Sequence, residues 1–524
     1  MAASVWVRAG RRRRTAVLFS GLLGVALAAA ISAIRVPVPR IHDEFSFLLA
    51  ADTFASGRLT NPTHPLWKHF ETFHVIHEPS YASKYPPLQG AMLALGTLAG
   101  HPIVGAWLAT GLLVAACCWM FQGWLPGRWA LLGAFAVAFH HGVQFYWGQS
   151  YWGGAVPMTG GALLFGGWAR LRRRPRRSAA LLMALGVGIL ANSRPLEGLV
   201  ACIPVGVSLL HRLISGRMPN GWVWFRDVVA PAAVVLAIFG SAMAYYNYRV
   251  TGDPLRLPYQ IHEQTYSDTP LFVWQDPRPK PVYRHAAIRD FYEGWVRGWY
   301  TDQKSLVSAF ANSAALLPFF LSPFLAVTML MLPWIVRSPR MRFALVAVAL
   351  VFAATLALPW EPRAHFLAPV GSLLFLLALQ GLRQLYQSRR VGRIAVGVIV
   401  AGHVLLFVAA VLRYPEVEPP AWTTERVHIV ERLEAERGNQ LVLVQYSQDH
   451  SPHEEWVWNA ADIDSAKVVW ARTTTAEATD EIRAYFAPRR AWTLHADVRP
   501  APLLVLAPRE TRPPLPQLEN LPGR

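Results

Sequence analysis

The chain has 524 residues, of which 53% are hydrophobic and only 16% charged, and it carries 21 tryptophans. These proportions exclude an ordinary soluble enzyme and indicate a polytopic membrane protein. The formal net charge of +18 does not indicate nucleic-acid binding, because the Lys and Arg residues form short clusters between apolar segments rather than one basic face. The cysteines Cys117, Cys118 and Cys202 all lie in apolar segments, so we expect no disulfide or zinc framework.

Apolar segments recur along the first 412 residues, and a helix needs about 20 mainly apolar residues to cross a bilayer. We predict eleven spans, at 16–36, 103–123, 129–146, 155–170, 178–193, 197–213, 228–247, 312–335, 342–358, 365–383 and 392–412. A cleaved signal peptide is the alternative for the first segment, since basic, apolar and small-residue regions follow in order. We favour a span, because the apolar run is long and prolines rather than a clear cleavage site end it.

The basic clusters give the orientation, because Lys and Arg in short loops favour the cytoplasmic side. Clusters at 170–177, 211–217, 337–342 and 388–393 all fall on one side if the N-terminus is cytoplasmic. The loops 37–102 and 248–311 and the C-terminal region are then outside the inner (plasma) membrane. The segment 86–100 is short and opens with two prolines, so we predict an interfacial or re-entrant helix there rather than a span.

The composition changes after residue 412. Before this point there are 37 basic and 15 acidic residues, whereas 13 basic and 17 acidic residues follow. We therefore predict an all-α transmembrane domain over 1–412 and a small α/β domain over 413–510, outside the membrane. Helical and strand patterns alternate there, with helices at 423–438 and 475–487 and strands at 440–446 and 501–508. The Pro-rich residues 511–524 are predicted to be disordered.

The adjacent acids Asp43 and Glu44 follow the first predicted span directly. Acids are common where a chain leaves the bilayer, so simple polarity at a helix end is the ordinary explanation. The same loop, however, also carries several His, Lys and Arg residues, including Arg58 and Lys84. An acid at a low-dielectric boundary can act as a base, while nearby cations bind an anion. We interpret Asp43 as a candidate base, with Glu44 as its orienting partner.

Cations also lie at three other points predicted to face outward. Lys84 precedes Tyr85 and two prolines, which favour an extended chain at the level of the lipid headgroups. Arg194 lies at a turn between two spans, and Arg363 and His365 lie at another helix mouth. A lysine that only contacts lipid, or arginines in structural pairs, would explain each one separately. Together they fit an anionic lipid headgroup, because Arg donates paired hydrogen bonds to phosphate.

The stretch 140–154 is rich in aromatic and amide side chains, including Gln149 and Tyr151. An aromatic belt at the membrane interface explains these residues as well as a sugar-binding cleft does. We list Arg58, Tyr85, Gln149 and Tyr151 as candidate substrate-binding residues. The stretch 451–472 of the C-terminal region is dense in aromatics and acids and is a further candidate for contact with acceptor or sugar, although an ordinary domain edge would look similar.

These motifs together resemble the GT-C glycosyltransferases, which include protein O-mannosyltransferases and the lipid A aminoarabinose transferase. The resemblance covers about residues 10–385 and consists of an outside Asp-Glu pair after the first span, a Lys-Tyr-Pro-Pro motif, an Arg-Pro turn and a late basic and proline cluster. It implies transfer of a sugar from a polyprenyl phosphate to an acceptor outside the membrane. It also implies that Asp43 is the catalytic carboxylate, and that Lys84 and Arg363 are candidates for binding the donor phosphate.

The chemistry that we expect is a single displacement with inversion. A departing lipid phosphate needs no strong acid, since its second pKa is near 6. One carboxylate can therefore deprotonate the acceptor hydroxyl while cations stabilise the phosphate. No cofactor is expected, and dependence on a divalent metal is doubtful, because the stretch 148–154 has no acid where many GT-C proteins carry one. The partners are a polyprenyl-phosphate sugar and an acceptor that the sequence does not define.

Two other classes of protein remain possible from the sequence. A transporter or flippase for lipid-linked sugars usually carries polar residues in mid-membrane and repeats internally. The predicted spans here have almost no charge in their interiors, and the polar residues gather at one side. A binding protein without turnover fits the same loop residues.

Overall fold

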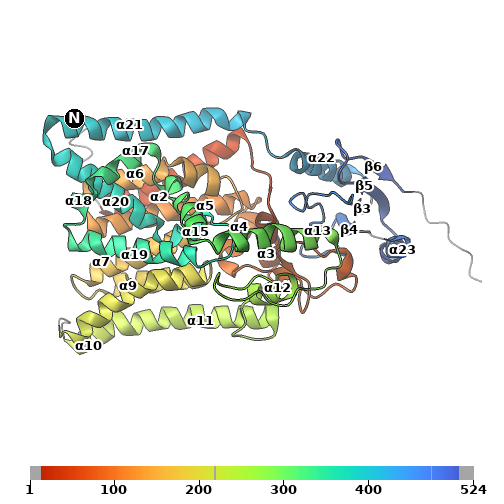
Figure 1. Ribbon diagram of the computed structural model, residues 1–524, viewed down its shortest axis with the longest axis horizontal. Coiled ribbons are helices and arrows are strands. Elements are labelled where there is room, and N and C mark those ends of the chain that lie inside the picture. Colours follow the sequence, from red (N-terminus) through yellow and green to blue (C-terminus); the bar gives the residue numbers. More distant parts are fainter. Residues whose placement is uncertain (1–12, 217–219, 474, 507–524) are drawn as a thin grey trace, which may run out of the picture.

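The computed structural model describes residues 13–216, 220–473 and 475–506, which form a long helical bundle with a small sheet beyond one end (Figure 1). The helices α11 (Ala230–Thr251) and α21 (Arg389–Arg413) run along opposite edges of the bundle. Residues 511–524, for which we predicted disorder, lie outside the described residues.

Seven helical stretches among the described residues are long and apolar enough to cross a membrane, so the protein is a multi-pass membrane protein. A pair of helical segments, 306–320 and 323–335, would make an eighth span, but the two are bent by 104° at their junction. The seven are α2 (Arg13–Ile34), α5 (Ile103–Trp124), α9 (Pro195–Ile214), the stretch Gly221–Thr251 containing α10 (Gly221–Trp224), η3 (Phe225–Val229) and α11, then α19 (Pro339–Leu356), α20 (Ala368–Gln387) and the stretch Arg390–Glu416 within α21 and η7 (Tyr414–Glu416).

The other three predicted spans are shorter helices, so the count of eleven is only partly supported. α6 (Gly127–Ala138), α7 (Ala155–Leu171) and α8 (Arg177–Ala191) have 12, 17 and 15 residues. The span predicted at 129–146 is interrupted because α6 ends at Ala138 and a π-helical segment, η2 (Gly142–Trp147), follows. The side-chain amide of Gln144 donates a hydrogen bond of 2.8 Å to the Ala138 carbonyl. This bond satisfies a carbonyl at the end of α6 that has no partner within the helix.

The centre of the bundle is packed closely around α7 and α20, whose residues are nearly all buried. A Cβ atom on Gly161 would lie only 1.8 Å from the Pro369 carbonyl oxygen. Only glycine therefore allows the two backbones to come this close.

The loop predicted at 37–102 is largely ordered structure. Asp43 and Glu44 lie in the first turn of a helix, α3 (His42–Ala55), where the positive end of the helix dipole favours acids. A short turn, η1 (Trp67–His69), precedes an antiparallel hairpin of β1 (Val75–Ile76) and β2 (Ala82–Ser83). The short helix predicted at 86–100 is α4 (Pro87–Leu98), which packs against α3 and α5 and is too short to cross a bilayer.

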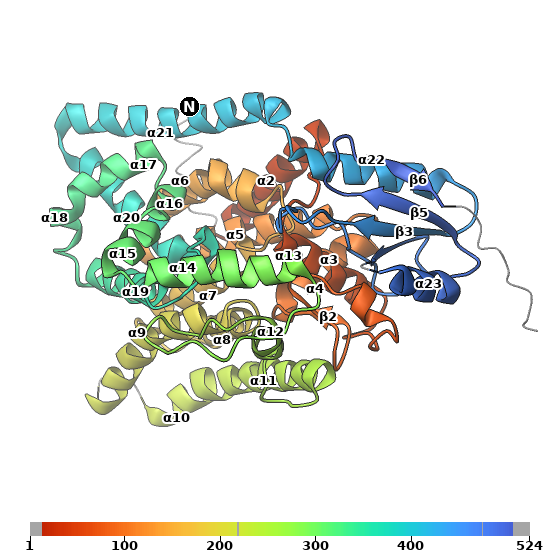
Figure 2. The same ribbon diagram turned by 45° about the vertical axis from the view of Figure 1, so that its right-hand side comes forward.

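A second excursion leaves the bundle between α11 and α19. Its first part passes near the hairpin, and its second part is a nearly continuous helix that lies across the front in Figure 2. The elements are α12 (Pro258–Tyr266), α13 (Ala286–Arg289), η4 (Asp290–Val296) and α14 (Arg297–Gln303), followed by α15 (Leu306–Ala314), α16 (Leu317–Phe320), α17 (Pro323–Ala326), η5 (Val327–Met331) and α18 (Leu332–Ile335). The turn η6 (Ala364–Phe366) leads into α20.

The C-terminal region forms a four-stranded sheet in the order β4-β3-β5-β6, with α22 at one side and α23 at the other (Figures 1 and 2). β3 pairs in parallel with β4 and β5, and β6 is antiparallel to β5. The two helices and two of the strands lie where predicted, whereas β4 and β5 were not predicted. The elements are α22 (Ala421–Ala435), β3 (Gln440–Gln445), β4 (Val468–Arg472), α23 (Ala476–Tyr485), β5 (Arg490–His495) and β6 (Leu503–Val505).

Among the described residues, the hydrophobic core of the C-terminal region is continuous with that of the neighbouring loops. One buried cluster joins the sheet to α3, to the loop before β1 and to η4. Within it, the rings of Phe45 and Trp458 stack at 4.6 Å between centroids. This shared core fixes the C-terminal region over the end of the bundle.

Candidate active site

A cavity of about 380 Å³ lies where the end of the bundle meets the C-terminal region. Its lining comes from α3, the segment after β2, the start of α9, α12, η4, α14 and η6, together with His453 from the loop between β3 and β4. Segments more than 400 residues apart in the chain thus meet at one place. Asp43, Lys84, Arg194 and Arg363, which the sequence singled out separately, all line this cavity.

Asp43 is the acid without a strong cationic partner. Its Oδ1 accepts a short hydrogen bond from the Tyr85 hydroxyl, and its Oδ2 lies 3.9 Å from His74 Nε2. Among the described residues, no Lys or Arg nitrogen comes within 4.0 Å of its carboxylate. Burial, followed by the Asp43 charge, raises the pKa of Tyr85 well above its ordinary value, so Tyr85 remains a hydrogen-bond donor. The carboxylate is therefore positioned by neutral groups and remains free to accept a proton.

Lys84 enters the same cavity but is already paired. Its Nζ lies 3.1 Å from Oε1 of Glu263 on α12, and His262 Nδ1 lies 3.5 Å from the same oxygen. Burial alone would raise the pKa of Glu263, but the Lys84 ammonium and His262 lower it to about 2. Glu263 is therefore ionised throughout the neutral range, and an incoming anion meets a lysine that already contacts a carboxylate.

The two arginines are paired in the same manner. Arg194 Nη1 lies 3.6 Å from Glu197 Oε1, within the first turn of α9, and the guanidinium faces the Phe366 ring. Arg363 contacts Glu361, two residues earlier, and lies over the Trp152 ring at 5.7 Å. Both arginines line the cavity.

His365 is a neutral neighbour of these arginines. Burial, followed by the charges of Arg194 and Arg363, lowers the pKa of His365 well below its ordinary value. Its ring meets Trp152 edge-on at 4.7 Å. His365 can therefore donate or accept a hydrogen bond in the cavity but does not add a positive charge at neutral pH.

Four candidates from the sequence do not line the cavity. Glu44 is buried, and its carboxylate accepts hydrogen bonds from the backbone N–H groups of Arg40 at 2.8 Å and Tyr151 at 3.0 Å. The Tyr151 hydroxyl donates to the Pro37 carbonyl at 2.9 Å. These bonds tie the chain before α3 to the loop after η2, so they support the wall around Asp43.

The amide of Gln149 is also used inside the protein. It donates to the Ala28 carbonyl at 2.8 Å and accepts from Ser32 at 2.6 Å, both on α2. Arg58 follows α3 and lies away from the cavity lining. The polar atoms of Glu44, Tyr151 and Gln149 thus join separate segments of the chain rather than face the cavity.

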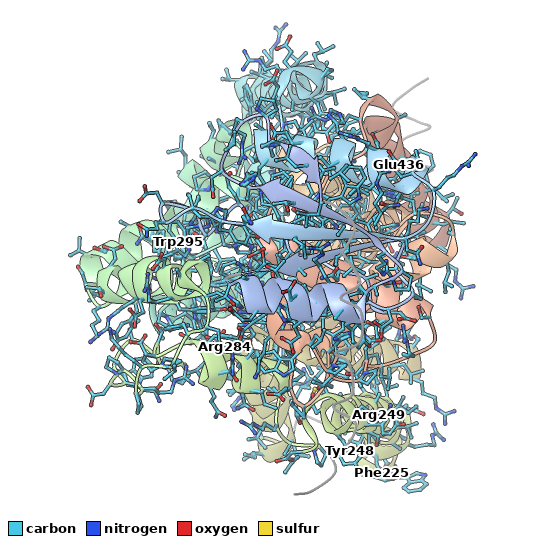
Figure 3. The ribbon with its side chains drawn as sticks, turned by 90° about the vertical axis from the view of Figure 1, so that its right-hand side faces the viewer. Phe225, Tyr248, Arg249, Arg284, Trp295 and Glu436 are labelled. Carbon is cyan, nitrogen blue, oxygen red and sulfur yellow. The ribbon has the colours of Figure 1, made fainter. Side chains whose placement is uncertain are left out.

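The C-terminal region contributes His453 to the cavity lining. His453 lies in the lining, and its ring is stacked on His42 at 6.3 Å and meets Trp295 edge-on at 4.8 Å. His42 Nε2 and the Pro452 carbonyl form a hydrogen bond of 2.9 Å. In Figure 3 the C-terminal sheet faces the viewer, and Trp295, which belongs to η4, lies to one side of the sheet.

Comparison with known proteins identifies the fold. No family model and no curated protein sequence matches the chain. The crystal structure of ArnT from Cupriavidus metallidurans bound to undecaprenyl phosphate aligns with a TM-score of 0.53, at 14% identity, over 90% of this chain and 92% of that chain. The chain has a GT-C glycosyltransferase fold. The apo state of the same ArnT gives a TM-score of 0.53, at 13% identity, over 94% of this chain and 93% of that chain.

A more distant similarity extends to the oligosaccharyltransferase of Archaeoglobus fulgidus. Its apo form aligns with a TM-score of 0.44, at 10% identity, over 92% of this chain and 69% of that chain.

Three residues of the candidate site were not singled out from the sequence. Glu263 lies in an ordinary polar helix, 179 positions from its partner Lys84, and nothing local marks it. His74 was only one of several histidines in its loop. His453 falls inside the stretch 451–472, which the density of aromatics and acids had marked. Among residues 13–216, 220–473 and 475–506, no group of three or more His, Cys, Asp or Glu side chains is arranged to hold a metal ion.

Proposed function

We propose that the protein is an integral-membrane glycosyltransferase that moves a sugar from a polyprenyl phosphate to an acceptor hydroxyl in this cavity. The observation that carries the proposal is the carboxylate of Asp43, which has no Lys or Arg partner within 4.0 Å among the described residues, in one cavity with three cations. The fold shared with ArnT, which was crystallised with undecaprenyl phosphate, supports a polyprenyl-phosphate donor. The distribution of basic clusters supports a cavity on the non-cytoplasmic side.

Asp43 is the general base of the proposed reaction. The acceptor hydroxyl gives its proton to Asp43 while its oxygen attacks the anomeric carbon, and the bond from that carbon to the phosphate oxygen breaks. Attack from the side opposite the phosphate inverts the anomeric centre. The Tyr85 hydroxyl keeps the carboxylate in one orientation, as its hydrogen bond to Oδ1 leaves Oδ2 for the proton.

Lys84, Arg194 and Arg363 are the proposed ligands of the donor phosphate. Each can exchange part of its contact with a glutamate for a phosphate oxygen, because the new contact replaces one anion by another. The apolar part of the lining fits the first isoprene units of the lipid. It includes Leu196 at the start of α9 and Leu358 after α19, which are the ends of two candidate spans.

The experiment that tests this function is a transfer assay with purified protein in nanodiscs, using a panel of polyprenyl-phosphate sugars. We expect wild-type turnover, and a loss of about 10³-fold in kcat for Asp43→Asn, within the range for removal of a general base. The matched control is Asp52→Asn in the same helix, since Asp52 Oδ2 accepts from Ala461 N at 2.7 Å outside the cavity. Undiminished activity in Asp43→Asn, or donor binding without any product from the wild type, would refute the proposal.

A further inference from the structure

Arg40 is a fourth cation of the cavity, and the proposed reaction does not use it. Four carboxylates and four Lys or Arg side chains line this cavity. Three of these cations are paired, with Glu263, Glu197 and Glu361 respectively. The two charges that remain are Asp43 and Arg40, which are three positions apart around the start of α3. Asp43 is the proposed base, so Arg40 is the cavity cation that has no assigned anion.

The guanidinium of Arg40 is accessible and has no partner in the described part of the chain. No carboxylate oxygen of those residues lies within 4.0 Å of it, and none of their side chains or carbonyls forms a hydrogen bond with it. Arg40 is exposed to solvent and also lines the cavity, so it lies at the rim. An anion can therefore approach Arg40 without displacing a carboxylate, which is not the case at the three paired cations.

The buried Glu44 holds Arg40 near the paired cations. Its carboxylate accepts hydrogen bonds from the backbone N–H groups of Arg40 at 2.8 Å and of Tyr151 at 3.0 Å, so these two segments lie side by side. Tyr151 is followed by Trp152, and the Arg363 guanidinium lies over the Trp152 ring at 5.7 Å. The backbone of Arg40 is thus close to the segment that carries the aromatic partner of Arg363.

Glu44 is nevertheless a poor counterion for Arg40. Burial raises the pKa of Glu44, whereas the hydrogen bonds from the two backbone N–H groups and the charge of Arg40 lower it, and the net shift is upward. A buried carboxyl with a raised pKa carries less negative charge than an exposed glutamate does. The cavity rim therefore presents a positive charge that the protein does not neutralise locally.

The position of Arg40 along the chain is next to a membrane span. The candidate span α2 ends at Ile34, and residues 35–40 lead from it to the cavity. At no more than about 3.5 Å per residue, Arg40 lies within about 20 Å of the end of that span. A polyprenyl donor must enter the cavity from the bilayer, because its chain stays in the lipid. A cation at this position can meet the phosphate before the paired cations do, each of which must first loosen its glutamate.

We propose that Arg40 is an entry subsite for the phosphate of the polyprenyl donor, which binds at the cavity rim before it passes to the paired cations. This proposal rests on the polyprenyl-phosphate donor of the proposed function. The step is binding only, so no covalent bond is made or broken in it. A charge at the rim of a binding site acts mainly on the association rate and on its dependence on salt. Arg40 should therefore speed the capture of the lipid more than it slows its release.

Binding of radiolabelled undecaprenyl phosphate to the full-length protein in a neutral detergent tests the subsite without turnover. We expect Arg40→Gln to raise the Kd by about 10-fold at low salt, mainly through slower association, and Arg40→Lys to stay within about 3-fold of wild type. In about 0.5 M NaCl the loss in Arg40→Gln should shrink to about 2-fold, because salt screens an exposed charge. The thermal unfolding midpoint of Arg40→Gln should equal that of wild type, since the guanidinium has no partner in the described protein.

The matched control is Arg35→Gln. Arg35 belongs to the same segment after α2 and lies over the Tyr414 ring at 4.8 Å, but it does not line the cavity. This variant should bind undecaprenyl phosphate as wild type does. Competition separates the possible sources of phosphate. Phosphatidylglycerol and inorganic phosphate should each displace the label far less effectively than unlabelled undecaprenyl phosphate at the same concentration.

Three results would overturn the subsite and leave the proposed function intact. One is a wild-type Kd in Arg40→Gln, in an assay where Lys84→Met weakens binding. Another is an equal loss in Arg35→Gln. The third is displacement of the label by phosphatidylglycerol or inorganic phosphate as effective as that by undecaprenyl phosphate, which would make Arg40 a general contact for anions. A wild-type protein that binds no undecaprenyl phosphate would overturn both proposals, whereas binding without sugar transfer would overturn the proposed function alone.

Discussion

Two regions of the cavity differ in whether their charged side chains have partners of opposite charge. We call the first the acid region, made of Asp43, Tyr85 and His74, and the second the paired-cation region, made of the pairs Lys84–Glu263, Arg194–Glu197 and Arg363–Glu361. In the acid region a carboxylate is surrounded by neutral donors, whereas in the paired-cation region every positive charge already has an anion. In the proposed reaction, proton removal and phosphate binding are therefore separate tasks, and the glutamates limit the affinity for phosphate.

The largest effect should come from removing the central cation of the paired-cation region. Lys84→Met leaves Glu263 buried without its partner, so the donor phosphate would meet a net negative charge. We expect kcat/KM for the donor to fall by about 10²- to 10³-fold, as for other truncated buried pairs. The double variant Lys84→Met/Glu263→Gln should regain part of this loss, and Lys84→Arg should retain more activity than Lys84→Met. If Lys84→Met keeps its kcat/KM for the donor within 3-fold of wild type, a difference of about 0.7 kcal/mol, then Lys84 does not bind the donor phosphate.

A smaller effect of opposite sign should follow when only the glutamate is changed. Glu263→Gln removes the anion that competes with phosphate for Lys84, so the KM for the donor should fall by about 3- to 10-fold. The same variant should be less stable, because a buried charge loses its partner. Steady-state kinetics together with the thermal unfolding midpoint measure both effects, and an increase in the donor KM would contradict the competition.

The contribution of the Lys84–Glu263 pair to the stability of the protein should also depend on pH, and it should be lost in acid. Burial alone would raise the pKa of Glu263, but Lys84 and His262 lower it from 4.5 to about 2. A depressed carboxyl pKa stabilises the fold above the unfolded value, and this contribution is lost as the pH falls from 4.5 toward 2. The midpoint of wild type minus that of Glu263→Gln should therefore be constant near neutral pH and should shrink in that acid range.

The smallest effect should come from changing His453, the cavity residue of the C-terminal region. His453→Ala removes a ring that lines the cavity from the C-terminal loop. We expect the KM for the acceptor to rise by about 3- to 5-fold, a loss of about 1 kcal/mol, while the donor KM stays unchanged. An effect on the donor KM alone would assign His453 to the paired-cation region instead.

Much of the bundle could be predicted because membrane spans leave a local signal in the sequence. About 20 apolar residues in a row identify α2, α5 and α9 without reference to any partner. The break after Ala138 and the 104° bend near residue 321 could not be predicted in this way, because hydropathy does not report specific hydrogen bonds such as the one from the Gln144 amide to the Ala138 carbonyl. Hydropathy alone therefore gave too many full-length spans.

The candidate site could be predicted in part for a related reason. Charged residues beside apolar segments are rare and visible, so Asp43, Lys84 and Arg363 could be selected before their neighbours were known. Gln149 and Tyr151 have equally suggestive side chains, but their polar atoms bond to α2 and to the chain before α3. Whether an amide or hydroxyl is free for a ligand is decided by the folded backbone around it and not by its local sequence.

The hydrophobic cluster that joins the sheet to α3 and η4 has a consequence for how such proteins can be recombined. Exchange of the C-terminal sheet and its helices alone with those of another protein of this fold would leave foreign side chains facing Phe45 and Phe73. A functional chimaera would have to carry α3 and the hairpin along with the sheet. If His453 contacts the acceptor in the proposed reaction, substitutions in its loop would alter acceptor preference without disturbing this shared core.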